Sequence, residues 1–110
     1  MKTYTSILYF NTGLHERINV GLIMFNELYC IVELKQSKMN FVKHFKPESF
    51  DLFEHAVTSF KDYFSKEMPT HAQIKRLSNY KNGVFKLETP NFIAIDFTGE
   101  NFNKFFDKHI

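Results

Sequence analysis

Polar residues at the start of a strongly apolar segment are the best candidates for chemistry in this chain. Glu16, Arg17 and Asn19 lead into the run Val20–Phe25, and His15 stands beside them. In a catalytic interpretation, a general base from this group acts next to Arg17 and Asn19, which hold an anionic or carbonyl substrate. The protein would then be a small hydrolase or nuclease that uses His15, Glu16 and Arg17.

The same residues also fit a structural role. Glu16 and Arg17 would form an ion pair that closes the first connection of the chain, and Asn19 would bond backbone groups that the strand leaves unpaired. Neighbouring residues in a strand point to opposite faces, so Glu16 and Arg17 are poorly placed to act on one substrate. We therefore favour a structural clamp and keep the catalytic site as the alternative.

Other catalytic chemistry has little support in the sequence. The five histidines include no pair at i, i+4, and there is no His-Glu-x-x-His or Cys-x-x-Cys motif, so we predict no metal and no cofactor. The lone Cys30 lies between Tyr29 and Ile31, which is typical of a small buried hydrophobic residue. Gly-x-Ser-x-Gly elbows and glycine-rich phosphate loops are also absent. We therefore predict that the protein is not an enzyme.

Positive charge gathers in two stretches that contain no acidic residue, 35–46 and 68–87. If both stretches emerge at one end of an antiparallel sheet, they form a single basic face, and loops at such an end commonly carry binding residues. Charges at the rim of an interface mainly raise the rate of association. We predict that an acidic partner meets residues among Lys38, Lys43, Lys46, Lys75 and Arg76.

Two alternatives to this protein-binding face stay open. The lysines can be ordinary solvated side chains. Aromatic and basic residues also alternate from Lys38 to Lys46, so Phe41 and Phe45 could stack on bases while Lys43 and Lys46 meet phosphates. The second alternative makes the protein a nucleic-acid-binding accessory.

The elements that position these residues can be predicted from periodicity. Alternating β-branched and aromatic residues, and one segment that is apolar on both faces, predict strands. Gly21, inside the apolar segment, indicates a bulge or a close approach of backbone beneath the main helix. The predicted strands are Thr3–Phe10, Ile18–Phe25, Tyr29–Leu34, Val84–Leu87 and Phe92–Asp96.

Three helices are expected beside these strands. Phe53, Val57 and Phe60 lie on the apolar stripe of the main helix, which follows Pro47. The second helix begins after Thr70 in a capping-box pattern and ends at Asn82-Gly83, and Thr98 caps the third. The order strand-strand-strand, helix-helix, strand-strand, helix predicts an α+β fold with a mainly antiparallel sheet of about five strands.

Composition sets the class of protein. At 110 residues, with 14 Phe and 5 Tyr, the chain is expected to form a single domain, 1–110, with a phenylalanine-rich core. The single cysteine excludes an internal disulfide, and neither a signal peptide nor an apolar span of membrane length is evident. We therefore expect a cytoplasmic protein with no membrane partner.

The first half of the chain resembles a small uncharacterised bacterial family, domain of unknown function 3037. The resemblance is carried by Tyr4–Leu8 and by Glu16-Arg17-Ile18-Asn19-Val20-Gly21, which continues to Phe25. It implies a prokaryotic or phage origin and suggests a HipA-like kinase as partner, and it carries over no catalytic role. We predict a small protein-binding module, such as a toxin–antitoxin or kinase-associated subunit, or a phage inhibitor of a host defence enzyme.

Overall fold

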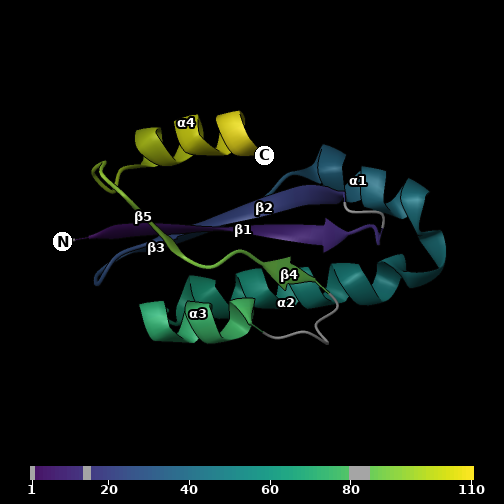
Figure 1. Ribbon diagram of the computed structural model, residues 1–110, viewed down its shortest axis with the longest axis horizontal. Coiled ribbons are helices and arrows are strands. Elements are labelled where there is room, and N and C mark those ends of the chain that lie inside the picture. The colour runs from purple at the N-terminus through teal and green to yellow at the C-terminus, as the bar shows by residue number, and fades with distance from the viewer. Residues whose placement is uncertain (1, 14–15, 80–84) are drawn as a thin grey trace.

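A central antiparallel sheet organises the chain, which a computed structural model describes over residues 2–13, 16–79 and 85–110 (Figure 1). The sheet has five strands in the order β3-β2-β1-β4, and the short β5 also pairs with β1. The strands are β1 (Thr3–Asn11), β2 (Arg17–Phe25), β3 (Cys30–Leu34), β4 (Lys86–Leu87) and β5 (Asn91–Ile93). The predicted α+β class and the five-stranded antiparallel sheet are confirmed.

A β-bulge interrupts the pairing of β1 with β2. Leu8 lies opposite Gly21 and Tyr9 lies opposite Asn19, so Val20 is an extra residue in β2. A bulge shifts the alternation of side chains by one position. Val20 before the shift and Ile23 after it therefore reach the same core, although they are three residues apart.

Gly21, next to the bulge, lies against β3. A Cβ at this position would be 2.7 Å from the carbonyl oxygen of Glu33 and 2.7 Å from Cδ2 of Leu34. Real Cβ atoms essentially never approach other atoms so closely. The predicted close approach is therefore present, but it comes from the neighbouring strand and not from the main helix.

Three helices pack against one face of the sheet, where the larger core lies. They are α1 (Gln36–Phe45), α2 (Phe50–Lys66) and α3 (His71–Ser78), and a 3-10 turn, Pro47–Ser49, precedes α2. Phe53, Val57 and Phe60 of α2 are buried in this core, as their spacing predicted. Figure 1 shows α2 and α3 on the side of the sheet opposite the last helix.

The helix α1 is a correction, because we predicted three helices and the described residues form four. Its two buried side chains, Met39 and Val42, give only a narrow apolar stripe among lysines, and no side chain caps its first turn. It ends before Pro47, because a residue that precedes proline disfavours helical backbone. The sequence signal for α1 was therefore weak at both ends.

The last helix, α4 (Gly99–His109), covers the other face of the sheet. Phe102 and Ile110 pack there against Ile7, Leu22 and Met24, so β2 is buried from both sides as predicted. Hydroxyl caps begin the last two helices. The hydroxyl oxygen of Thr70 accepts from the Gln73 N–H of α3, and that of Thr98 accepts from the Asn101 N–H of α4. The predicted starts of α3 and α4 are thus confirmed.

The segment after α3 differs from its prediction in length. α3 ends at Ser78, the predicted Asn82-Gly83 turn and Val84 lie outside the described residues, and β4 begins only at Lys86. β5 ends at Ile93, well before Asp96. Both strands lie at the edge of the sheet, and as far as the structure describes the chain, each pairs with β1 alone.

Candidate functional site

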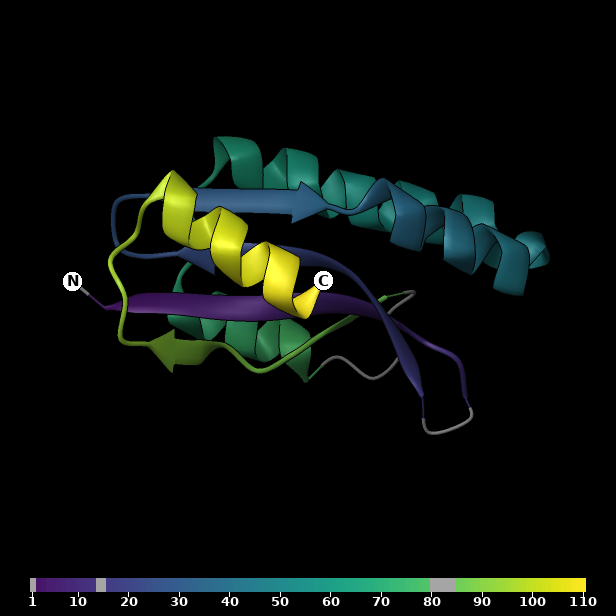
Figure 2. The same cartoon turned by 90° about the horizontal axis from the view of Figure 1, so that it is seen from above.

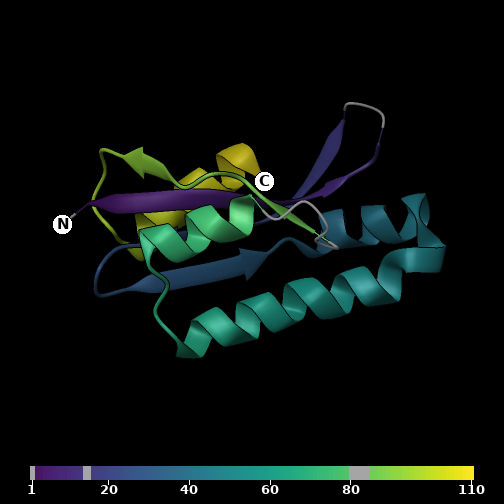
Figure 3. The same cartoon turned by 60° about the horizontal axis from the view of Figure 1, so that its bottom comes forward.

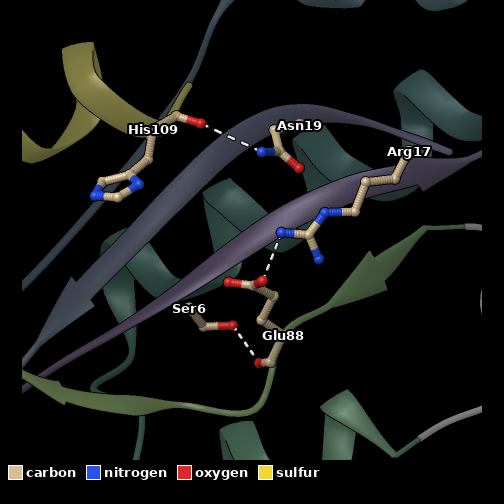
Figure 4. Close-up of polar contacts among 5 residues, drawn as sticks. All are labelled: Ser6, Arg17, Asn19, Glu88 and His109. Carbon is tan, nitrogen blue, oxygen red and sulfur yellow. Dashed lines mark hydrogen bonds and ion pairs between the residues drawn. The ribbon is translucent and has the colours of Figure 1, made fainter.

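The polar residues at the start of β2 lie on the α4 side of the sheet, and Figure 4 shows their contacts. We use the name Arg17 cluster for Ser6, Arg17, Asn19, Glu88 and His109. Nη2 of Arg17 is 2.5 Å from Oε2 of Glu88, and the guanidinium also lies 4.4 Å from the centre of the Tyr9 ring. The side chains of Arg17 and Glu88 keep 37% and 27% of their surface exposed, so solvent screens this ion pair.

Hydrogen bonds from the backbone of Glu88 to β1 hold this residue in place. Its N–H donates to the carbonyl oxygen of Ile7 at 2.9 Å, and its carbonyl oxygen accepts from Oγ of Ser6 at 2.5 Å. Both bonds tie the residue after β4 to the middle of β1. The carboxylate that receives Arg17 is therefore fixed by the sheet, although it lies 71 residues further along the chain.

Asn19 connects β2 to the end of α4. Its Nδ2 donates to the carbonyl oxygen of His109 at 3.2 Å. This carbonyl group is one of the last four in α4, and such groups have no hydrogen-bond partner within their own helix. The Oδ1 of Asn19 is buried and accepts no hydrogen bond from the described residues. The amide thus stabilises the C-terminal end of α4 through one of its two polar atoms.

The predicted pairing of Glu16 with Arg17 is wrong, because Arg17 pairs with Glu88. Glu16 instead takes part in the turn through its backbone: its carbonyl oxygen accepts from the N–H and the hydroxyl of Thr12. His15, the third residue of the catalytic alternative, lies outside the described residues.

The arrangement is better suited to fastening segments together than to proton transfer. The contacts of Arg17 and Asn19 join the first hairpin to the segment after β4 and to the end of α4. Cys30 offers no nucleophile either, because burial raises the pKa of its thiol to about 12 and keeps it protonated at neutral pH. Among the residues that the structure describes, no group of three or more His, Cys, Asp and Glu side chains is placed to hold a metal ion.

The structure does not bring the five predicted basic residues together. Lys38 and Lys43 belong to α1 and Lys46 directly follows it, whereas Lys75 and Arg76 belong to α3. Figures 1 and 3 show α1 and α3 at separate positions along the long axis of the molecule. Both helices pack on the same core, so the basic residues form two patches on one layer and not a single face.

The helix α1 carries one of these groups of lysines and also exposed aromatic rings, with Lys43 on a different face of the helix from Phe41 and Phe45. We use the name α1 surface for Lys38, Phe41, Lys43, Phe45 and Lys46. Phe41 is 58% exposed and Phe45 is 43% exposed, and the rings of Phe45 and Phe10 form a T-shaped pair. Nζ of Lys43 lies 5.9 Å from the centre of the Phe50 ring, where α2 begins.

Two hollows complete the candidate sites, and sequence reasoning missed both because their walls come from distant segments. The first, of about 410 Å³, lies between Tyr4, Phe25 and Pro69 and is also lined by one residue of each charge, Lys2 and Glu27. The second, of about 420 Å³, lies between β3 and α4. It is lined by Ile31, Glu33, Leu34, Phe102, Phe106 and Asp107, among others.

Comparisons with known proteins add no identification. No protein-family model matches the chain, and neither a curated protein nor a solved structure matches it. The resemblance to domain of unknown function 3037 therefore stays a prediction. Within the described part of the chain, none of the helices combines the length and the apolar character needed to cross a bilayer.

Proposed function

We propose that the chain is a small protein-binding module, not an enzyme, and that it binds an acidic site on another protein through the α1 surface. The exposure of Phe41 and Phe45 on a helix without acidic residues supports this proposal most directly. Exposed aromatic rings surrounded by charged groups are typical of protein interfaces, where the rings supply affinity and the charges supply steering.

Another exposed apolar side chain follows α1 in the chain. Leu52, in the first turn of α2, is 60% exposed and follows Phe45 closely in the chain. The segment 35–47 holds Lys35, Lys38, Lys43 and Lys46 without a neutralising carboxylate. An acidic partner is therefore favoured, and a HipA-like kinase and a host defence enzyme are the first partners to test.

Charge reversal tests the proposal once a partner has been recovered with the tagged full chain. Replacing Lys43 and Lys46 with Glu should lower the association rate at low salt by about tenfold and change the dissociation rate much less. The matched control reverses Lys75 and Arg76 on α3. An equal effect of the two double variants, or no effect of the first, would contradict the assignment to α1.

Nucleic acid is the second candidate, because the same exposed rings could stack on unpaired bases. A fluorescent single-stranded oligonucleotide separates the two functions. Nucleic-acid binding should weaken steeply with salt and should require Phe41, since stacking on an aromatic ring contributes about 1–3 kcal/mol per base. Tight, salt-sensitive binding that Phe41→Ala abolishes would favour nucleic acid over an acidic protein.

A further inference from the structure

The free edge of β3 is a second surface whose chemistry can be worked out from the backbone. Over the described residues 2–13, 16–79 and 85–110, β3 is the last strand on its side of the sheet and pairs with β2 alone. An edge strand presents unpaired N–H and C=O groups to any extended segment that reaches it. Which groups these are follows from the hydrogen-bonding pattern of the β2–β3 hairpin.

Two hydrogen bonds fix this pattern at both ends of the hairpin. The N–H of Asn26 donates to the carbonyl oxygen of Tyr29 at 2.9 Å, and the N–H of Lys35 donates to the carbonyl oxygen of Val20 at 2.8 Å. Bonded pairs recur at every second residue of an antiparallel pair, so Ile31 and Glu33 also direct their backbone groups towards β2. The backbone groups of Cys30, Val32 and Leu34 therefore point outward, away from β2.

The hollow between β3 and α4 lies on one side of this edge. Phe102 and Phe106 of α4 form its aromatic wall, and Ile31 contributes an apolar side chain from β3. Of the described residues that line it, Glu33 and Asp107 are acidic and none is basic. An aromatic wall beside carboxylates suits a lysine or arginine side chain, whose stem packs on rings while its charged head meets the acids.

The other side of the edge is covered by α2. In Figure 2, which looks onto the α4 side of the sheet, α2 lies behind and beyond β3. Lys61 of α2 reaches the edge, where its Nζ is 3.3 Å from Oε2 of Glu33. Both side chains of this pair are substantially exposed, so the pair is weak and a newly added strand can displace it.

We propose that the edge of β3 binds an extended segment of a partner protein as a sixth strand, with a basic side chain of that segment in the hollow between β3 and α4. The backbone groups of Cys30, Val32 and Leu34 would hold the segment, and Glu33 and Asp107 would select its charge. A second copy of this chain fits less well. In Figure 2, α2 extends beyond β3, so the α2 helices of two copies paired through this edge would compete for the same space. The proposal rests on a protein-binding function but not on the α1 surface.

Synthetic peptides provide the probe. The test peptide alternates valine and lysine over seven residues; a second peptide carries glutamate in place of lysine, and a third is N-methylated at alternate residues so that it cannot donate to the edge. Hydrogen exchange of the full chain is followed by NMR. Without peptide, the N–H groups of Cys30, Val32 and Leu34 should exchange much faster than those of Ile31 and Glu33.

Millimolar lysine peptide should slow exchange at Cys30, Val32 and Leu34 by about tenfold or more, and the other two peptides should not. Asp107→Asn should weaken binding of the lysine peptide roughly two- to fivefold, the usual effect of an exposed ion pair. Asp51→Asn, which removes an exposed acid on α2 outside the hollow, is the matched control.

Three results would overturn the proposal: unchanged exchange with the lysine peptide, equal protection by the N-methylated peptide, or dimers of the free chain that protect the same three N–H groups. The chain with Lys43 and Lys46 reversed to Glu keeps the β3 edge intact. Peptide protection in that variant, together with loss of partner association, would show that the β3 edge and the α1 surface act separately. If the peptide does not bind but partner association still depends on Lys43 and Lys46, the β3 proposal fails and the α1 proposal stands.

Discussion

Replacing Gly21 with alanine adds only one methyl group but should destabilise the fold. The new Cβ would stand 2.7 Å from the Glu33 carbonyl oxygen, and ordinary contact begins near 3.4 Å. Leu34 Cδ2 is the end of a flexible side chain and can turn away. The carbonyl oxygen cannot, because Glu33 pairs with Leu22 in the sheet, so β3 itself must move by roughly 0.7 Å.

The expected cost of Gly21→Ala follows from this forced movement. Overpacking of a well-packed interior typically costs about 1–3 kcal/mol. Alanine also stiffens the unfolded chain, which offsets about 0.4–1 kcal/mol where the native backbone accepts it. The native position accepts a Cβ poorly, so we take the small end of this offset and expect a net cost of about 0.6–2.6 kcal/mol. For a domain of this size, each kcal/mol corresponds to a change in Tm of about 4 °C, so Tm should fall by about 2–10 °C.

Gly99→Ala is the matched control for thermal or urea unfolding followed by circular dichroism. A Cβ at Gly99 meets nothing within 4 Å, and the residue lies in the first turn of α4, where alanine is the better helix former. Its Tm should therefore rise by about 2–4 °C. A Gly21→Ala protein with the parent's Tm would refute the argument, because it would mean that β3 does not lie against Gly21.

The remaining predictions concern the core, the Arg17 cluster and the cysteine. Phe60→Ala should lower the free energy of unfolding by about 3–5 kcal/mol, as usual for a buried phenylalanine, and urea unfolding measures it; a loss below about 1 kcal/mol would mean that the face of α2 is misplaced. Arg17→Ala should cost only about 0–1 kcal/mol, since the pair is exposed, and a double-mutant cycle with Glu88→Ala should return a coupling energy in that range. Cys30 should resist alkylation in the native protein at neutral pH and react rapidly in urea. Because burial raises the pKa of Cys30 from 9.0 to about 12, its contribution to stability is complete below pH 9 and should be lost between pH 9 and 12, in contrast to a Cys30→Ala control.

Periodicity predicted the parts of the fold that local sequence controls. The stripe through Phe53, Val57 and Phe60 gave the buried face of α2, and the hydroxyls of Thr70 and Thr98 gave the starts of two helices. Each of these signals acts within about two helical turns, so one segment contains all the information. The helix α1 lacks such a signal, because its place depends on packing Met39 and Val42 against distant strands.

The candidate sites depend on contacts that no local pattern encodes. Arg17 was correctly singled out, but its partner Glu88 lies across the sheet and is held there by bonds from Ser6 and Ile7. The two hollows are likewise assembled from segments far apart in the chain. Charge counting predicted basic stretches, but they are separated because α2 carries the chain along the long axis from α1 to α3 (Figure 1).

The bulge at Val20 determines which side of the sheet the polar and apolar residues of β2 face. With strict alternation, Asn19 and Ile23 would point to the same face. The extra residue instead places Asn19 on the α4 side, where it reaches the carbonyl oxygen of His109, and Ile23 in the larger core. Asn19 thereby helps to hold α4 against the sheet. α4 forms one wall of the hollow beside β3. Asn19, from the polar motif at the start of β2, therefore supports the proposed peptide site by holding α4 in place.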